Sequence, residues 1–255
     1  MRILAIHAHP DDVEMLAAGT LALLAERGHE VTIATMTSGD CGSDVLPAAE
    51  IADLRHGEAT AAAAVIGAEY RCLQFPDLGV FNDNASRRRV TALLRQVRPQ
   101  IVLAASPIDY HCDHEAASVL VRDACFAAPV PNYSTAAIHA APPLDAIPHL
   151  YYVDAVEGSD STGNLIVPHF VVDVCSTLET KKRMLACHAS QREWLLRHHG
   201  MDDYIESMVN WTHACGARAG IAYGEGFRLH RGHPYPRSPL LEELLGAELV
   251  HRPRL

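Results

Sequence analysis

A complete strand–helix–strand pattern at the start of the chain constrains its fold more than any other feature. Residues 2–7 form a nearly continuous apolar run, typical of a strand buried on both faces of a parallel sheet. Pro10 stands where a helix can begin, and Gly28 should end that helix shortly after Glu26. A second strand is expected over residues 29–36. Two strands joined by a helix within so short a span indicate an α/β fold.

The rest of the chain repeats this alternation. Further strands are expected over residues 70–75, 100–105, 149–153 and 169–174. Helices are expected over residues 47–66, 86–97, 115–127, 177–193, 201–219 and near 239–245. The sequence therefore predicts a single domain over residues 1–255, folded as a Rossmann-like three-layer sandwich with a mostly parallel sheet.

Three segments carry more specific expectations. The arginines of the helix over 86–97 should form a solvated face, and residues 129–148 should be a long loop that shapes the substrate pocket. Ser176 and Glu179 form a capping-box signal for the helix over 177–193. The tail from Tyr223 onward, rich in Gly, Pro, Arg and His, should be a loop with one short helix.

Bulk properties exclude several classes of protein. A formal net charge of −10 argues against a nucleic-acid-binding protein and against adhesion to anionic membranes. Seven cysteines, an odd number with no C-x-x-C spacing, indicate reduced thiols and not a disulfide framework or a zinc ribbon. No signal-peptide pattern is seen, and no apolar run reaches the roughly 18 residues of a membrane span. The cytoplasm is the expected location.

Two clusters of metal-binding residue types follow two of the predicted strands. His9, Asp11 and Asp12 come after the first strand. A second cluster, His111-Cys112-Asp113-His114, comes after the strand over 100–105. Ligand sites of open α/β sheets lie at the carboxyl ends of the strands, so both clusters should meet at one edge.

These residue types suit a catalytic zinc site, which needs three N or O ligands and one open position. His9, Asp12 and either His111 or His114 could supply the ligands. Asp11 suits a general base that takes a proton from zinc-bound water, and the remaining histidine could stabilise an oxyanion or protonate a leaving amine.

Other interpretations of the same residues are simpler. A single histidine is more often a core or capping residue, and an aspartate at a helix start is often only a cap. A nucleotide cofactor is not indicated, because no G-x-G-x-x-G or P-loop pattern occurs, and no G-x-S-x-G supplies a serine nucleophile. Cys112 as a thiol nucleophile would compete with a metal for the same histidines.

The motifs also resemble a known family. Ala8-His9-Pro10-Asp11-Asp12 after an N-terminal strand, followed later by His111-x-Asp113-His114, is similar to the LmbE/PIG-L zinc-dependent N-acetylglucosaminyl deacetylases. The resemblance extends over residues 1–191 through three further matches: Arg55-x-x-Glu58-Ala59, Pro76-Asp77-x-Gly79 and His188-x-Ser190-Gln191. The chain departs from the family pattern at Val13, after the aspartate pair, and at Cys112, where many members have proline.

The resemblance implies a role for each matching residue. It implies that His9, Asp12 and His114 bind zinc, while Asp11 acts as general base and His111 as its electrostatic partner. It further implies that Asp113 orients a ligand histidine. Arg55 and Asp77 resemble positions that hold the sugar hydroxyls, and the resemblance places His188 next to the pocket. Tyr110 is a further candidate for substrate binding that could line the pocket or pack on the sheet edge.

We therefore expect a zinc hydrolase that removes an N-acyl group, above all N-acetyl, from an amino sugar or its conjugate. Iron or cobalt could occupy the same ligands. One alternative is a zinc amidase acting on a thiol conjugate, an antibiotic or another small N-acyl compound. Another is a non-catalytic α/β module that binds a metal or a sugar. The sequence leaves open whether the chain forms a homo-oligomer.

Overall fold

One eight-stranded sheet organises the protein. The structure, a computed structural model, describes residues 1–199 and 203–254. The order of the strands across the sheet is β3-β2-β1-β4-β5-β7-β6-β8. These strands are β1 (Arg2–His7), β2 (Glu30–Thr37), β3 (Glu69–Phe75), β4 (Ile101–Ala104), β5 (His149–Val153), β6 (Phe170–Asp173), β7 (Gly224–Leu229) and β8 (Val250–His251).

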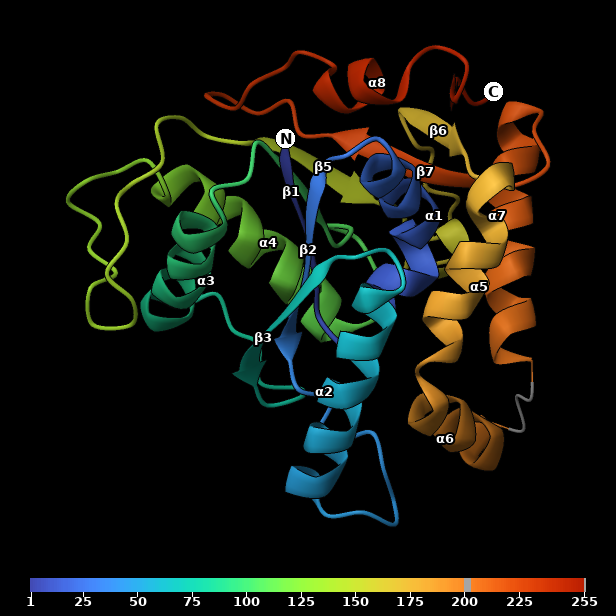
Figure 1. Cartoon of the computed structure of the whole chain (residues 1–255), viewed down its shortest axis with the longest axis horizontal. Coiled ribbons are helices and arrows are strands. Elements are labelled where there is room, and N and C mark those ends of the chain that lie inside the picture. The colour runs from blue at the N-terminus through green and yellow to red at the C-terminus, as the bar shows by residue number, and fades with distance from the viewer. Residues whose placement is uncertain (200–202, 255) are drawn as a thin grey trace.

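Helices cover both faces of the sheet, giving the three predicted layers (Figure 1). Helices α3 and α4 pack on one face, and α1, α5 and α8 on the other. The helices are α1 (Asp12–Glu26), α2 (Ala48–Ala64), α3 (Asn84–Val97), α4 (Cys112–Ala127), α5 (Leu178–Ala186), α6 (Ala189–His199), α7 (Tyr204–Ala219) and α8 (Leu240–Leu245). Short 3-10 turns occupy Val156–Gly158 and Cys175–Thr177.

The first strand lies inside the sheet and is buried on both sides, as its apolar run predicted. Ile3 and Ala5 point into the core beneath α1, and Leu4 and Ile6 point into the core beneath α3 and α4. This alternation follows from the two-residue period of a strand. No helix among the described residues is both long and apolar enough to cross a membrane.

The strand directions create the crevice that the site needs. From β3 to β5 all neighbouring strands are parallel, with β1 between β2 and β4. The chain leaves β1 toward β2 on one side, and β4 lies on the other side of β1, so the connections diverge at the carboxyl ends of these two strands. Ligands bind at such switch points in open α/β sheets. Beyond β5 the pairs are antiparallel, which agrees with a mostly parallel sheet.

Two expectations about the C-terminal half are wrong. The helix predicted over 177–193 is two helices, α5 and α6, separated at Cys187 and His188, and no side chain caps the start of α5. The tail predicted as loop contains β7, which pairs with both β5 and β6. Helix α7 agrees with the prediction over its described part, and positions 201 and 202 lie outside the described residues.

Residues 129–148 form a long loop as predicted, but two related expectations are wrong: this loop does not shape the cavity, and Arg95 of the arginine stripe is not solvated. Two arginines, one in α3 and one at its C-cap, donate hydrogen bonds to the backbone of this loop and of the residue before it. Arg95 is buried and donates to the carbonyls of Ala128 and Val130, while Arg98 donates to that of Pro143. The loop therefore packs beside α3 and contributes no residue to the cavity over the predicted site.

Replacing Gly226 with alanine should destabilise the fold. A Cβ atom there would lie 2.1 Å from the Asp154 carboxylate, which is buried under α7. Overpacking of this kind costs about 1–3 kcal/mol. Urea unfolding measures the loss, and Gly57→Ala, at an open position in α2, is the control that should not be destabilised. Equal stability of Gly226→Ala and the native chain would contradict the packing described.

Candidate active site

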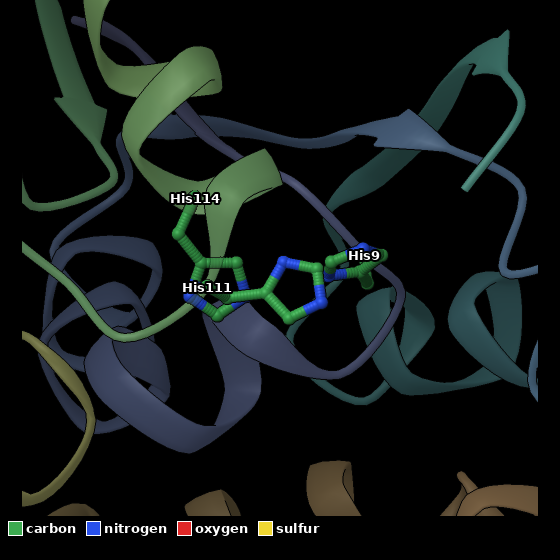
Figure 2. Close-up of side chains that lie close together, drawn as sticks. All are labelled: His9, His111 and His114. Carbon is green, nitrogen blue, oxygen red and sulfur yellow. The ribbon is translucent and has the colours of Figure 1, made fainter. Parts of the chain in front are cut away.

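Both predicted clusters meet at the carboxyl ends of β1 and β4. His9 lies in the loop after β1, His111 caps the start of α4, and His114 lies in the first turn of α4. Figure 2 shows the three rings gathered at this edge. The ring centres are 4.7 Å apart for His9 and His111, 4.9 Å for His111 and His114, and 5.3 Å for His9 and His114. Residues about one hundred positions apart thus form one cluster.

The Asp12 carboxylate is shared among histidines. Its Oδ2 lies 2.6 Å from Nδ1 of His7 and accepts the backbone N–H of His9 at 2.7 Å. Its Oδ1 lies 3.4 Å from Nε2 of His114. Both oxygens face the histidine cluster, because Oδ2 also lies 3.4 Å from Nδ1 of His9.

Two further carboxylates orient the histidine rings. Asp109 Oδ1 lies 3.0 Å from Nδ1 of His114, and Asp113 Oδ2 lies 3.2 Å from Nε2 of His9. Asp113 also accepts the backbone N–H of Leu78 at 2.7 Å, which fixes the carboxylate itself. Histidines that bind metals usually have such a partner on the second ring nitrogen. Asp113 thus lies beside the ring of His9, and its role in orienting a metal ligand stays a prediction.

The ionisation of the cluster reflects these carboxylates. Burial lowers the pKa of His114, but Asp12 and Asp109 outweigh burial and raise it to about 10. Burial likewise opposes the charge of His9, yet its hydrogen bonds to Asp113 and Asp12 raise its pKa to about 9. Without a bound metal, these carboxylates therefore favour the protonated form of both rings. A metal taking the same nitrogens would displace these protons, since only neutral imidazole binds a metal.

Asp11 has different partners from its neighbour Asp12. It lies at the start of α1 with a φ of 94°, in the left-handed region that non-glycine residues rarely adopt. Its Oδ1 lies 3.6 Å from Nη2 of Arg55, and its Oδ2 accepts a hydrogen bond from the Tyr204 hydroxyl. Burial raises the pKa of Asp11, and the charge of Arg55 opposes that rise. A buried carboxylate with raised basicity suits proton transfer.

His111 is placed as a neutral hydrogen-bond donor. Its Nδ1 accepts the backbone N–H of Asp113 at 3.1 Å, so the ring hydrogen resides on Nε2. Burial and the charge of His9 lower the pKa of His111. The ring lines a cavity of about 730 Å³ that opens over the cluster. Cavities that bind small molecules span roughly 300–1,000 Å³.

The two residues predicted to hold sugar hydroxyls already form hydrogen bonds with the protein backbone. Arg55 and Asp77 both line the cavity. However, Arg55 donates to the carbonyl of Pro10 at 2.7 Å, and the oxygens of Asp77 accept the backbone N–H groups of Gly39 and Cys41 at 3.1 and 2.9 Å. Their polar groups therefore fix the loops around the cavity.

Tyr110 and His188 are placed differently from each other. Tyr110 lines the cavity and is 66% exposed, so its phenol is available to a ligand. His188 is fully buried and is absent from the cavity wall; its Nε2 lies 3.5 Å from the Glu14 carboxylate. His188 therefore does not face the cavity.

Three residues at this site escaped the sequence analysis. The sequence could have indicated His7, because this residue ends β1 and begins a His-Ala-His run just before the aspartate pair. Asp109 lies five positions before His114, but aspartate in a loop is common. Tyr204 had no local signal, since α7 brings it to the site from a distant part of the sequence.

The donor set fits a metal ion. Potential ligand atoms lie within 4.8 Å of one another in the group His9, His111 and His114 and in the group His7, Asp12 and His114. The predicted ligands His9, Asp12 and His114 do not form one of these groups: His9 belongs to the first, Asp12 to the second and His114 to both. His9 Nδ1 and His114 Nε2 each lie 3.4 Å from the carboxylate of Asp12. Two imidazoles and a carboxylate form a set typical of catalytic zinc.

Comparison with known proteins gives the family. The family model described as PIG-L, GlcNAc-PI de-N-acetylase, matches residues 4–125. A diacetylchitobiose deacetylase of Thermococcus kodakarensis is 28% identical, covering 91% of this chain and 84% of that enzyme. The structure of N,N'-diacetylchitobiose deacetylase from Pyrococcus horikoshii superposes with a TM-score of 0.77 at 25% identity, covering 93% of this chain and 88% of that one. The chain thus contains a PIG-L family domain over residues 4–125, and its similarity to these deacetylases extends over most of its length.

One relative has a different kind of activity in its name. A 4-oxalmesaconate hydratase of Pseudomonas putida is 31% identical over 156 residues, which cover 57% of this chain and 60% of that enzyme. The fold is thus shared by deacetylases and at least one hydratase. The function of this chain has to be argued from its own site.

His7→Leu should weaken metal binding without removing any predicted ligand. The substitution removes the closest partner of Asp12 Oδ2, 2.6 Å away, and leaves the backbone N–H of His9 as its remaining hydrogen bond, so the carboxylate is held less firmly. Loss of such supporting contacts costs about 10–100-fold in metal affinity. Zinc titration calorimetry measures the change, with His7→Asn as the variant that keeps a donor near Asp12 and binds more tightly than His7→Leu. Native affinity in His7→Leu would refute this role.

Proposed function

We propose that this protein is a metal-dependent hydrolase that removes an N-acyl group, above all N-acetyl, from an amino sugar or an amino-sugar conjugate. The observation that carries the proposal is the division between two adjacent aspartates. Asp12 contacts histidines of the cluster, whereas Asp11 contacts Arg55 and Tyr204. A hydrolase needs both functions, one carboxylate for the metal and one for the proton. Names of relatives support an acetylated amino sugar as substrate.

His9, Asp12 and His114 would hold the metal, and the proposal takes zinc as its identity. Zinc favours imidazole and carboxylate donors with one position left open. A bound ion would supply Lewis-acid chemistry by polarising the amide carbonyl and making water acidic. Asp109 and Asp113 keep the His114 and His9 rings in place for this task.

The remaining steps belong to side chains of this chain. Asp11 removes a proton from the attacking water, and burial that raises its pKa increases its basicity. His111 presents its Nε2–H to the carbonyl oxygen as negative charge develops there. The proton on Asp11 then passes to the departing amine as the C–N bond breaks. The products are a carboxylate and a free amine.

The charge of the cavity favours a neutral sugar over a polycarboxylate. Among the described residues that line the cavity, Arg55 is the one arginine or lysine, and it is already engaged with Pro10 and Asp11. Five lining residues are carboxylates: Asp11, Asp12, Asp77, Glu157 and Asp160. The five carboxylates still outnumber the positive charges of Arg55 and of the His9 and His114 rings, or of a divalent ion in place of the ring protons, so an oxalmesaconate would meet net repulsion here. The hydratase activity of the relative is therefore the weaker candidate.

The compartment and the breadth of substrate are part of the same proposal. All seven cysteines are unpaired in the structure, which supports a reducing cytoplasm. A thiol conjugate or antibiotic as the N-acyl substrate would use the same site. A module that only binds would not need the separate placement of Asp11, so we favour an enzyme.

A substrate panel tests the function directly. Purified protein of known zinc content is incubated with N-acetylglucosamine, diacetylchitobiose, an N-acetylglucosaminyl inositol and an N-acetyl amino acid, and free amine is measured. Parallel samples receive an oxalmesaconate, and hydration is followed by absorbance. Amine release from the sugars is expected. Hydration without amine release, or no turnover by zinc-loaded protein on any compound, would overturn the proposal.

Asp11→Ala should separate catalysis from metal binding. Because Asp11 has no contact with the predicted ligand rings, zinc content should stay at the native level, while kcat falls by about 10²–10⁴-fold. Metal analysis and amine release measure the two effects. Asp12→Ala is the matched variant one position along, and it should lose the metal together with activity. A near-native kcat in Asp11→Ala would exclude Asp11 as the base.

A further inference from the structure

Tyr204 reaches the proposed base from the far end of the chain. It is the first residue of α7 and is 2% exposed, yet it belongs to the wall of the cavity. Its hydroxyl donates a hydrogen bond to Oδ2 of Asp11. This contact joins residues 193 positions apart.

Packing leaves the Tyr204 ring little freedom. The ring belongs to a small apolar cluster with Leu185 of α5 and Met208 of α7, and Met15 of α1 packs against that cluster. Met15 lies one turn beyond Asp11 on the same helix. The cluster therefore fixes the phenol relative to the backbone that carries Asp11. A hydroxyl held in this way can orient a carboxylate without moving itself.

The two oxygens of Asp11 have different surroundings. Oδ2 is occupied by the Tyr204 hydroxyl, whereas Oδ1 lies 3.6 Å from Arg55, beyond hydrogen-bonding distance. Arg55 uses the same nitrogen, Nη2, to bind the carbonyl of Pro10 at 2.7 Å. Oδ1 is thus the oxygen with capacity to accept a proton from water.

We propose that Tyr204 is a positioning residue, which binds Oδ2 of Asp11 and so presents Oδ1 to the attacking water. The inference rests on the proposed function, because it gives Asp11 the task of a base. It assigns part of the catalytic geometry to α7, outside residues 4–125 matched by the family model. Tyr204 acts through Asp11 and exchanges no proton with the substrate.

Tyr204→Phe tests the proposal with the ring and its packing retained. We expect kcat to fall about 10–100-fold, since misplacement of a catalytic group by about 1 Å costs that much. KM should stay within about twofold, and zinc affinity should be unchanged. Tyr151→Phe is the matched control, because Tyr151 is also a buried phenol bound to a carboxylate, Glu242 Oε2 at 2.9 Å, but lies outside the cavity wall. The control should keep native kcat.

A double-mutant cycle distinguishes positioning from a direct contact with substrate. In an Asp11→Ala background, Tyr204→Phe should cause no further loss of kcat, because the carboxylate it orients is gone. An equal loss in both backgrounds would overturn the proposal, as would a rise in KM at constant kcat. A native kcat in Tyr204→Phe would also overturn it.

The same double-mutant cycle can be measured by unfolding temperature instead of activity. This second readout separates the present inference from the proposed function. Tyr204→Phe should lower the unfolding temperature of the native chain, because it leaves the buried Oδ2 of Asp11 without a partner. In the Asp11→Ala background that shift should vanish or reverse. If the wild-type protein releases no amine, the proposed function fails. Additive temperature shifts would instead show that Asp11 and Tyr204 are not coupled, and the positioning role fails.

Discussion

The parallel pairing of β1 with β4 is the constraint on which the site depends. The pairing runs from Ile3 opposite Ile101 to Ile6 opposite Ala104, so both strands end at the same level of the sheet. The loop after β1 and the start of α4 therefore face each other across one crevice. A shift of register would carry His9 away from His111 and His114 and would separate Asp12 from the ring of His114. The metal-binding geometry is thus a consequence of strand pairing.

The second constraint is the backbone conformation of a single residue, Asp11. Two adjacent aspartates serve different tasks because the backbone at Asp11 takes a positive φ just as α1 begins. This turn sends one carboxylate toward Arg55 and Tyr204 and the next toward the histidines. Non-glycine residues in this conformation usually reflect functional strain, held in place by the surrounding structure. Buried neighbours of both carboxylates supply that support here.

The sequence predicted the fold class and the meeting of the two clusters because each depends on local patterns. An apolar run marks β1, and His/Asp runs mark two strand ends. Features set by distant contacts were missed. Strand β7 contains Gly224 and Gly226, which weaken a strand signal, but both are needed because Val171 and Asp154 leave no room for a Cβ atom. Tyr204 gains its role only through a tertiary contact, whereas Asp109 is close to His114 in the sequence but looks like any loop aspartate. Arg95 was predicted to be solvated because its partners are backbone carbonyls that follow α4, and backbone carbonyls carry no sequence signal.

The positions of the cavity residues along the chain have an evolutionary consequence. All the proposed ligands and the proposed base precede residue 125, where the match to the family model ends. Much of the wall that a substrate would meet comes later, from Glu157, Trp194 and Trp211. Substitutions in the second half can therefore change which molecule is admitted, while the residues proposed for its chemistry stay intact. Selection can diversify substrates in such a chain without rebuilding its reactive centre.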